Sequence, residues 1–333
     1  MDFTTKNKRM TNYSYLYSFK YDYHHSDLCK LESRQLFDAV EENKLLFSNI
    51  KVDPSMSPFI KKRIDIISSS ENYSELLKNI KKENIRIDGF KIEYLILDGD
   101  TTEYAERLHK LRDVGFCIDA PPDYYSPSIT YAICYYKNVW YFGVLIKQNT
   151  DWHKHKNKPF SFSNSISINI AKTLVNIASK GDKANQILDA CCGVGTVILE
   201  GCISGFSIEG CDNNLKVYQH TVDNLSYYNY TTNVYHRDIK DHDKKYDSAI
   251  IDLPYNHYSK TNDNLLSIII ESTAKLSPRI VIVSIEDIEP IIKKAGLKIS
   301  DFCTVEKRGK IKFARNIWLC EKEMIPIVGQ NTL

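Results

Sequence analysis

The residues best suited to chemistry lie in one stretch of the 333-residue chain, ILDACCGVGTVILEG, at positions 187–201. A short apolar run ends there in Asp189, and a turn with Gly193 and Gly195 opens a helical pattern. Glycine lacks the Cβ atom that would keep a ligand away from the backbone, and open α/β sheets bind ligands at the carboxyl ends of their strands. The stretch therefore predicts a ligand held closely at a strand–turn–helix junction.

The next apolar run indicates what this ligand contains. It ends in Asp212, 19 residues beyond Gly193, and a carboxylate at that distance can accept hydrogen bonds from ribose hydroxyls. A dinucleotide-binding turn has a further glycine three positions after the second one, which admits a pyrophosphate. Because Ile198 occupies that position, the pattern disfavours NAD and favours a smaller ribose-bearing cofactor, S-adenosylmethionine (SAM). A tight turn without any ligand is the remaining alternative.

The tetrapeptide DLPY follows a later apolar run and offers groups for reaction at an amine. The Asp252 carboxylate and the Leu253 carbonyl could accept the hydrogens of an exocyclic base amine, whose lone pair is otherwise delocalised into the ring. Pro254 would stiffen the turn, and Tyr255 would offer a flat face for an extruded base. We therefore predict Asp252, Leu253, Pro254 and Tyr255 as catalytic residues; a strand followed by an ordinary Asp-Pro type of turn is the alternative.

Further cofactor contacts are predicted around the glycine turn. Asp238, after the third strand-like run, is placed to accept from an adenine amino group, unless it is an exposed loop carboxylate. Cys191 is expected to pack against the ligand, and the KPFSFSNS segment at 158–165 is predicted to form a lid over its methionine end. The residues predicted to bind the cofactor are Asp189, Cys191, Gly193, Gly195, Thr196, Asp212, Asn213, Asp238 and Asp252.

A parallel sheet would bring these residues together, and the second half of the chain has the pattern of one. From position 186 on, short apolar runs alternate with helical stretches, as in βαβ units. Two late runs, 299–305 and 314–320, have no helical pattern between them and predict a closing antiparallel hairpin. The first half mixes strand-like and helix-like segments and ends in a hairpin pattern at 129–146, which predicts an α+β region.

Both motifs resemble those of class I SAM-dependent methyltransferases, specifically the THUMP-containing RNA guanosine-N2 methyltransferases. The catalytic signature of that family is Asp or Asn, Pro, Pro and an aromatic residue, which DLPY matches except at Leu253. The methyl-donor turn of the family, of the kind DPFCGTG, is matched by DACCGVG at 189–195. The stretch 118–146 looks like the closing half of a THUMP domain.

The resemblance implies the fold and the domains. We expect an α/β class I methyltransferase fold, Rossmann-like, with a seven-stranded, mostly parallel sheet and an antiparallel final strand, preceded by an α+β THUMP-like domain. The predicted domains are a THUMP-like RNA-binding domain at 1–146, a linker at 147–166 and a SAM-dependent methyltransferase domain at 167–333.

The resemblance also implies an activity and a partner. The expected reaction is methylation of the exocyclic N2 amine of a guanosine in tRNA; ribosomal RNA guanosine, DNA adenine N6 and an inactive RNA-binding protein are the alternatives. In the family the first domain grips the acceptor end of tRNA. Phosphate contacts could come from basic residues, although each could equally be a solvated side chain. These are Lys61, Lys62, Arg63, Lys81, Lys82 and the stretch Lys154–Lys158.

Composition limits other possibilities. The net charge of +2 excludes a polycation that binds nucleic acid indiscriminately. The nine cysteines form no CxxC pair, and His153 and His155 have no further ligand at zinc spacing, so we expect no metal and a solvated linker. No apolar run approaches the roughly 18 residues that span a bilayer, and the first residues lack a signal-like core. We expect a cytoplasmic monomer without membrane partners.

Overall fold

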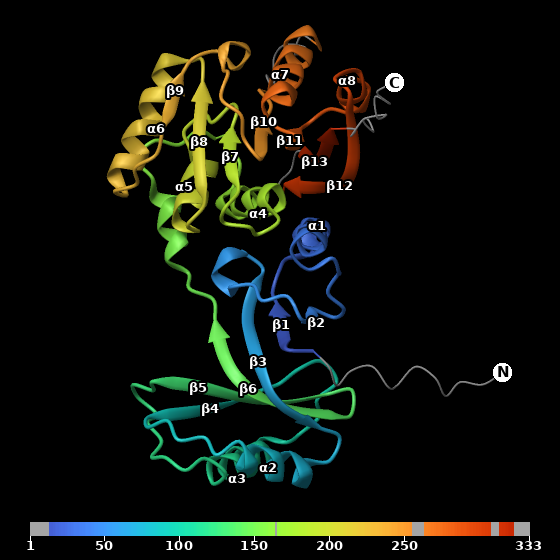
Figure 1. Ribbon diagram of the computed structural model, residues 1–333, viewed down its shortest axis with the longest axis vertical. Helices are drawn as coiled ribbons and strands as arrows, with labels where there is room; N and C mark the ends of the chain where they lie inside the picture. Colours follow the sequence, from blue (N-terminus) through green and yellow to red (C-terminus); the bar gives the residue numbers. More distant parts are fainter. Residues whose placement is uncertain (1–12, 164, 255–262, 308–312, 323–333) are drawn as a thin grey trace, which may run out of the picture. The chain divides into compact units, whose positions relative to one another are not determined.

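The computed structural model describes residues 13–163, 165–254, 263–307 and 313–322. They divide into two compact units, which are drawn in Figure 1. The first unit consists of the residues up to Lys20, Glu41–Ser55 and Phe59–Asn149; the second consists of Tyr21–Val40, Met56–Pro58 and the residues from Thr150 on. The sequence predicts a domain at 1–146 and a domain at 167–333, joined by a linker at 147–166, whereas in the structure two segments of the first half belong to the second unit.

Helices α1 (Ser26–Phe37) and α4 (Ile168–Ser179) explain why early residues join the second unit. The two helices pack together, and the fully buried Asn176 of α4 reaches both early segments. Its Nδ2 atom donates to Glu32 Oε1 at 2.6 Å and to the Met56 carbonyl at 2.9 Å. Buried polar groups require such partners, so these hydrogen bonds tie the early segments to α4.

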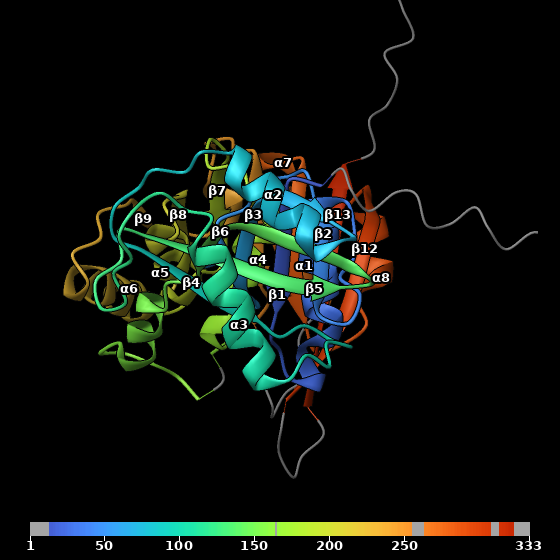
Figure 2. The same ribbon diagram turned by 90° about the horizontal axis from the view of Figure 1, so that it is seen from below.

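The first unit is a six-stranded mixed sheet with two helices on one face, the α+β arrangement that the sequence predicts. Its strand order is β2-β1-β3-β6-β5-β4, in which β4 and β5 are parallel and the other pairs antiparallel. Figure 2 shows α2 and α3 on the same side of β4, β5 and β6. The elements are β1 (Tyr15–Phe19), β2 (Leu45–Ser48), β3 (Ile60–Ser70), α2 (Tyr73–Lys82), β4 (Phe90–Leu95), α3 (Tyr104–Gly115), β5 (Ile129–Tyr136) and β6 (Val139–Lys147).

The second unit contains a seven-stranded sheet in its described residues, with the order β12-β13-β11-β10-β7-β8-β9. All neighbours pair in parallel except β13, which is antiparallel to β11 and β12. The predicted class I methyltransferase fold is thereby confirmed. Besides α1 and α4, its elements are the 3-10 turns η1 (Tyr23–His25), η3 (Asp151–Asn157) and η4 (Ile239–Asp241), β7 (Gln186–Asp189), α5 (Thr196–Ile203), β8 (Ser207–Asp212), α6 (Leu215–Tyr227), β9 (Val234–His236), β10 (Ser248–Asp252), α7 (Asp263–Leu276), β11 (Arg279–Ser284), α8 (Glu289–Lys294), β12 (Leu297–Lys307) and β13 (Phe313–Lys322).

The pleat of this sheet decides which residues can form a site. Successive side chains of a strand point to opposite faces. Ile251 and Leu253 belong to the core with α7 and α8. Asp252 and Ile250 therefore face the other way, and Asp189 joins them because it is the neighbour of Ile250 across the β7–β10 pair. Helix α4 packs on these strands. The carboxyls of Asp189 and Asp252 thus lie at the carboxyl ends of their strands, on the face of the sheet that α4 covers.

Candidate active site

The glycine turn follows β7 as predicted, and its conformation requires its glycines. Gly193 and Gly195 have φ of 55° and 76°, in the left-handed region that other residues rarely adopt. A Cβ atom at Gly195 would lie 2.7 Å from Cγ2 of Thr221, which is closer than side chains can approach. A Cβ atom at Gly193 would meet nothing within 4 Å among the described residues, so the turn borders open space there.

Helix α6 holds this turn through two residues that the sequence analysis missed. Thr221 Oγ1 donates to the Gly193 carbonyl, and Asn224 Nδ2 donates to the Val194 carbonyl at 2.9 Å. Asn224 also bonds both backbone polar groups of Phe160, at 2.9 and 3.0 Å. Part of the predicted lid therefore lies against α6, beside the turn, whereas Asn164 of that segment is outside the described residues. No motif marks Thr221 or Asn224, because neither stands out from an ordinary amphipathic helix.

Asp212 links the glycine turn to the end of β8. Its Oδ2 accepts from the Gly193 amide at 3.0 Å, and its Oδ1 accepts from the Asn214 amide at 2.9 Å. Burial raises the pKa of this carboxyl, while the two amides and His236 oppose the rise. Asn213 is exposed, and its carbonyl pairs with the His236 ring at 3.2 Å. The contacts hold Asp212 beside the turn, where it is predicted to bind a ribose.

Asp189 is the most deeply buried carboxyl of this edge. Asp189 is 1% exposed, and neither oxygen of its carboxyl group has a hydrogen-bond partner among the described residues. Burial, followed by the charges of Asp252 and Asp212, raises its pKa well above the usual range. An unsatisfied buried carboxyl is costly, and a cationic or N–H-bearing ligand at the neighbouring turn would relieve that cost.

Asp252 ends β10 on the same face as Asp189. Its Oδ1 is covered and has no hydrogen-bond partner among the described residues. Burial raises the pKa of this carboxyl to about 7, and the charge of Arg315 acts in the opposite direction. Arg315 is a site residue that the sequence analysis missed; it lies 63 positions further along the chain, and only the strand order brings it near.

The residues after Asp252 have different surroundings. Leu253 is 3% exposed, packs in the α7–α8 core and donates its amide to the Val283 carbonyl at 3.1 Å. The departure from the family signature thus has a packing role here. Pro254 is exposed, and Tyr255 lies outside the described residues. The catalytic roles of Leu253, Pro254 and Tyr255 stay predictions.

The remaining predicted cofactor residues surround the turn or follow the next strand. Cys191 is half-buried, and burial raises its thiol pKa well above the usual range. Thr196 is buried at the first position of α5. Asp238 is half-buried beyond β9, where it accepts from the Lys240 amide at 3.1 Å and lies 3.5 Å from Lys240 Nζ. Its carboxylate is therefore already partnered, in contrast to that of Asp189.

The geometry fits a ribose-bearing, cationic cofactor. Open space at Gly193 would admit a ligand, Asp212 stands next to it, and the unsatisfied Asp189 carboxyl offers an acceptor for an ammonium group. The four carboxyls of Asp189, Asp212, Asp238 and Asp252 follow the ends of four adjacent parallel strands. Such a row of acidic groups favours positive charge.

The WHKH segment is only in part the solvated linker that the sequence predicts: His153 and Lys154 are exposed, but His155 is not. His155 is fully buried; its Nδ1 lies 2.7 Å from Glu200 Oε1, and its Nε2 lies 3.3 Å from the Tyr230 hydroxyl. Lys172 Nζ lies 3.9 Å from the other Glu200 oxygen and donates to Ser204 Oγ at 2.7 Å. The expectation is wrong because α5 presents a buried acid that needs these partners, which local sequence does not reveal.

Among the lysines and arginine proposed to contact phosphate in the first unit, Arg63 is misassigned. It is buried, donates to both Asp65 oxygens at 2.5 and 3.0 Å and bonds the Val52 carbonyl at 2.8 Å. Lys61 Nζ donates to Gln148 Oε1 at 2.8 Å. Lys81 and Lys82 are exposed at the end of α2. A role in RNA binding stays a prediction for these lysines.

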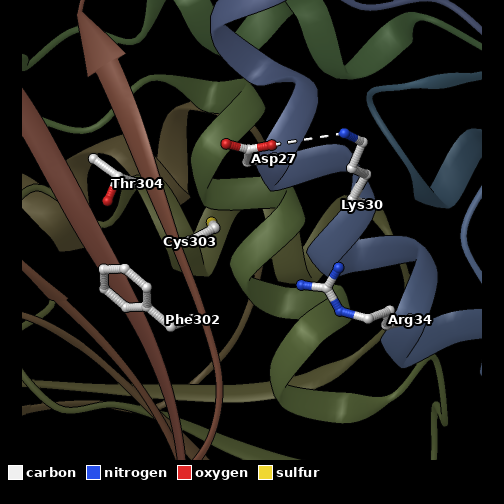
Figure 3. A pocket seen from close by; sticks show the side chains of 6 residues that line it. All are labelled: Asp27, Lys30, Arg34, Phe302, Cys303 and Thr304. Atoms are coloured by element: carbon white, nitrogen blue, oxygen red, sulfur yellow. Dashed lines mark ion pairs between the residues drawn. The ribbon is translucent and has the colours of Figure 1, made fainter.

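A separate cavity of about 350 Å³ lies between α1 and β12, away from the predicted site residues (Figure 3). Its most obvious anion ligand, Arg34, already holds both oxygens of Asp301 at 2.7 and 2.9 Å. Asp27 and Lys30 form an ion pair at 3.8 Å. The charges of this cavity are therefore largely engaged with one another, and it gathers no catalytic group.

The described residues contain no cluster of three or more His, Cys, Asp or Glu side chains arranged to hold a metal ion. None of their helices is long and apolar enough to cross a membrane.

No family model matches the chain. Among curated proteins, it is similar to the tRNA (guanine(10)-N2)-dimethyltransferase of Methanothermobacter thermautotrophicus, with 30% identity over 123 residues. This match covers 36% of the chain and 36% of that protein, so the chain spans only about a third of the length of the curated relative it matches.

Two solved structures have a similar path of the chain. TrmN from Thermus thermophilus is 13% identical and matches with a TM-score of 0.46 over 92% of this chain and 99% of its own. The magnesium protoporphyrin IX methyltransferase of Synechocystis PCC 6803, crystallised with SAM, is 16% identical and matches with a TM-score of 0.41 over 52% of this chain and 92% of its own.

Proposed function

We propose that this chain is a SAM-dependent methyltransferase that methylates the exocyclic N2 amine of a guanosine in tRNA. The observation that carries the proposal is a pair of carboxyls at the carboxyl edge of a class I methyltransferase sheet, the buried Asp189 and the half-buried Asp252. Both oxygens of Asp189 and Oδ1 of Asp252 are covered and have no hydrogen-bond partner among the described residues. Asp189 adjoins the glycine turn, and Asp252 begins DLPY. One carboxyl thus faces the proposed methyl donor, and the other faces the proposed acceptor.

The residues of the turn would hold SAM in a defined orientation. Asp212 would accept from the ribose hydroxyls, and Asp189 would accept from the α-ammonium group, which supplies the partner that its oxygens lack. Asp238 would reach the adenine amino group. SAM supplies an electrophilic methyl group on a sulfonium, so the protein need only align donor and acceptor and stabilise charge.

Asp252 would act on the acceptor amine. In its ionised form, Oδ1 would accept an amine hydrogen, which favours the pyramidal nitrogen that attacks the methyl group. The Leu253 carbonyl is proposed as the second acceptor. When the new N–C bond forms, the nitrogen becomes cationic and loses a proton; a carboxyl with a pKa of about 7 is suited to take it up.

Support for guanosine in tRNA comes from the DLPY resemblance and from the curated relative, which is named for guanine N2 dimethylation in tRNA. An RNA-binding role of the first unit, as a THUMP-like domain, belongs to the same proposal. Its α+β fold is compatible with this role.

The test uses purified protein, SAM and an unmodified tRNA transcript, followed by mass spectrometry of the nucleosides. We expect N2-methylguanosine or its dimethyl form with the wild type and almost none with Asp252→Ala. A matched duplex DNA substrate tests adenine N6 methylation, and ribosomal RNA tests the other guanosine acceptor. Methylated product in the DNA or in the ribosomal RNA, but not in tRNA, would overturn tRNA as the proposed substrate. Failure to bind SAM in a calorimetric titration would refute the enzyme proposal and favour an inactive RNA-binding protein.

A further inference from the structure

A second cavity, of about 490 Å³, lies in the second unit, and its lining among the described residues does not include the glycine turn or Asp212. Three segments form its wall: η1, the approach to α4, and the hairpin of β12 and β13. The lining residues that matter most are His24, Lys156, Lys158, Phe162, Glu306 and Arg315. Its volume is in the range of sites that bind small molecules or single nucleotides.

The charges of this cavity favour an anion. Lys156, Lys158 and Arg315 contribute positive charge from two of the three wall segments. The lining also contains the acids Asp22 and Glu306, of which Glu306 lies 3.9 Å from Nδ1 of His24. Burial lowers the pKa of Lys158, an effect that a neighbouring anion would oppose. Phosphate is an anion that lysine binds readily as a point charge.

The cavity also offers an aromatic surface. Phe162 is 42% exposed, although large apolar side chains tend to be buried. The Phe162 ring lies beside the His220 ring, with 6.0 Å between the ring centroids. The Phe160 ring stacks on the same His220 ring, with 4.2 Å between the centroids. A partly exposed ring beside lysines is the combination with which proteins bind unpaired nucleotides, since bases stack on the ring and phosphates meet the cations.

The strand register relates the cavity to Asp252. Asp252 pairs with Val283, and Val283 pairs with Ile317. Arg315 is two positions from Ile317 on β13, so its side chain projects from the same face of the sheet as Asp252. The charge of Arg315 acts on the Asp252 carboxyl, which agrees with their proximity. A ligand that reaches Arg315 is therefore on the side of the sheet where the acceptor amine is proposed to bind.

We propose that this cavity binds the nucleotide adjacent to the methylated one, with its phosphate at Lys156 and Lys158 and its base against Phe162. The inference rests on the proposed function, because it assumes an RNA strand whose target base lies at Asp252. In this proposal, the lysines and Phe162 position the RNA strand.

The first experiment measures affinity for a fluorescently labelled tRNA transcript by anisotropy, without turnover. The variant Lys156→Ala/Lys158→Ala is compared with Lys294→Ala/Lys298→Ala, which removes the same charge from two exposed lysines outside the cavity. We expect the cavity variant to bind tRNA about tenfold more weakly at 150 mM salt, and the control variant to bind tRNA within about twofold of the wild type. The slope of log affinity against log salt should fall in magnitude by about 1 to 2 in the cavity variant.

The second experiment isolates the aromatic contact. Phe162→Ala is expected to weaken tRNA binding about fivefold with no change in the salt slope, because stacking involves no phosphate. Phe302→Ala is the control, since Phe302 is also 42% exposed in the second unit but lines the cavity at α1. Thermal unfolding of every variant shows whether it is folded.

The two proposals fail in different ways. If each cavity variant binds tRNA as tightly as the wild type, the cavity is not a nucleotide site. The same holds if each cavity variant loses no more tRNA affinity than its control variant does. If the wild type transfers no methyl group while the lysine and Phe162 effects on binding appear, the activity is overturned and the RNA site stands.

Discussion

Two groups of buried carboxyls in the second unit have opposite surroundings. Glu200 on α5 is fully buried, and its Oε1 meets His155 Nδ1 at 2.7 Å. Its Oε2 has no hydrogen bond among the described residues, but it lies 3.9 Å from the Lys172 ammonium, within ion-pair distance. Asp189 and Asp252, at the carboxyl edge of the sheet, have covered oxygens without partners among the described residues. Burial raises the pKa of all three groups. Glu200 therefore stabilises the fold through its partners, whereas Asp189 and Asp252 have acceptor oxygens that a bound ligand could use.

The difference has a physical basis. Removing one partner of a buried ion pair is strongly destabilising, because it leaves the other charge buried and uncompensated. A buried carboxyl without partners is already unfavourable in the folded protein itself. Strain of the second kind persists where function requires it. Substitution should therefore affect stability at the Glu200 cluster and ligand binding or transfer at the sheet edge, and the predictions below test this separation.

The largest expected effect is on transfer in Asp252→Ala. Loss of the proposed acceptor for the amine hydrogen should lower kcat by about 10³-fold, as when a preorganised transition-state hydrogen bond is removed. The Kd of SAM should change little, and thermal stability should be retained or increase, because an unsatisfied buried carboxyl is gone. Single-turnover transfer, calorimetry and thermal unfolding measure the three quantities. Retained turnover would remove Asp252 from its role.

Glu200→Ala should show the reverse pattern. It leaves Lys172 and His155 buried without their acid, so the free energy of unfolding of the second unit should fall by roughly 3–5 kcal/mol. Urea unfolding followed by tryptophan fluorescence measures this loss, since Trp152 lies under Lys172 with 5.3 Å between Nζ and the ring centroid. Glu200→Gln, which keeps the shape and one acceptor, should lose less. Weaker SAM binding by folded Glu200→Ala protein would contradict the separation.

Much of the sheet edge was predictable from sequence because its determinants are local. A glycine turn needs left-handed backbone, and each parallel strand of this edge ends in or is soon followed by an aspartate, so Gly193, Gly195, Asp189, Asp212 and Asp252 can be read in order along the chain. The alternation of strands and helices and the late hairpin predict a parallel sheet with an antiparallel end, and the class I arrangement of that sheet is what the family resemblance implies.

The partners of these residues were not predictable, because they depend on contacts between distant segments. Arg315 reaches the Asp252 edge only through the pairing of β13 with β11. His155 was misread as solvated because its acid, Glu200, lies 45 positions away on an almost wholly apolar helix. The early segment 21–40 joins the second unit through the packing of α1 on α4, which composition does not indicate.

The pH dependence of transfer tests the ionisation of Asp252. The reaction requires the carboxylate, and the pKa of this group is about 7 in the folded protein. kcat/KM for SAM, which reports on the free enzyme, should rise about tenfold per pH unit below pH 7 and level off above it. A carboxyl whose folded pKa is raised stabilises most when protonated, so its contribution to stability is lost as pH rises through about 7. The Tm of the wild type, measured relative to that of Asp252→Asn, should therefore fall as the pH rises to about 7. A difference in Tm that does not change with pH would contradict the raised pKa.

The smallest effect is expected at Asp238. Its carboxylate already accepts from the Lys240 amide and neighbours Lys240 Nζ, and it is partly exposed to water. A hydrogen bond donated by the adenine amino group to this carboxylate would replace existing partners and contribute only about 1 kcal/mol. Asp238→Ala should therefore raise the Kd of SAM by less than about tenfold, whereas Asp189→Asn, in the unsatisfied site, should raise it more. Calorimetry of both variants compares them directly. If Asp238→Ala weakens binding more than Asp189→Asn does, lack of a partner for a buried carboxyl does not mark the cofactor site in this fold.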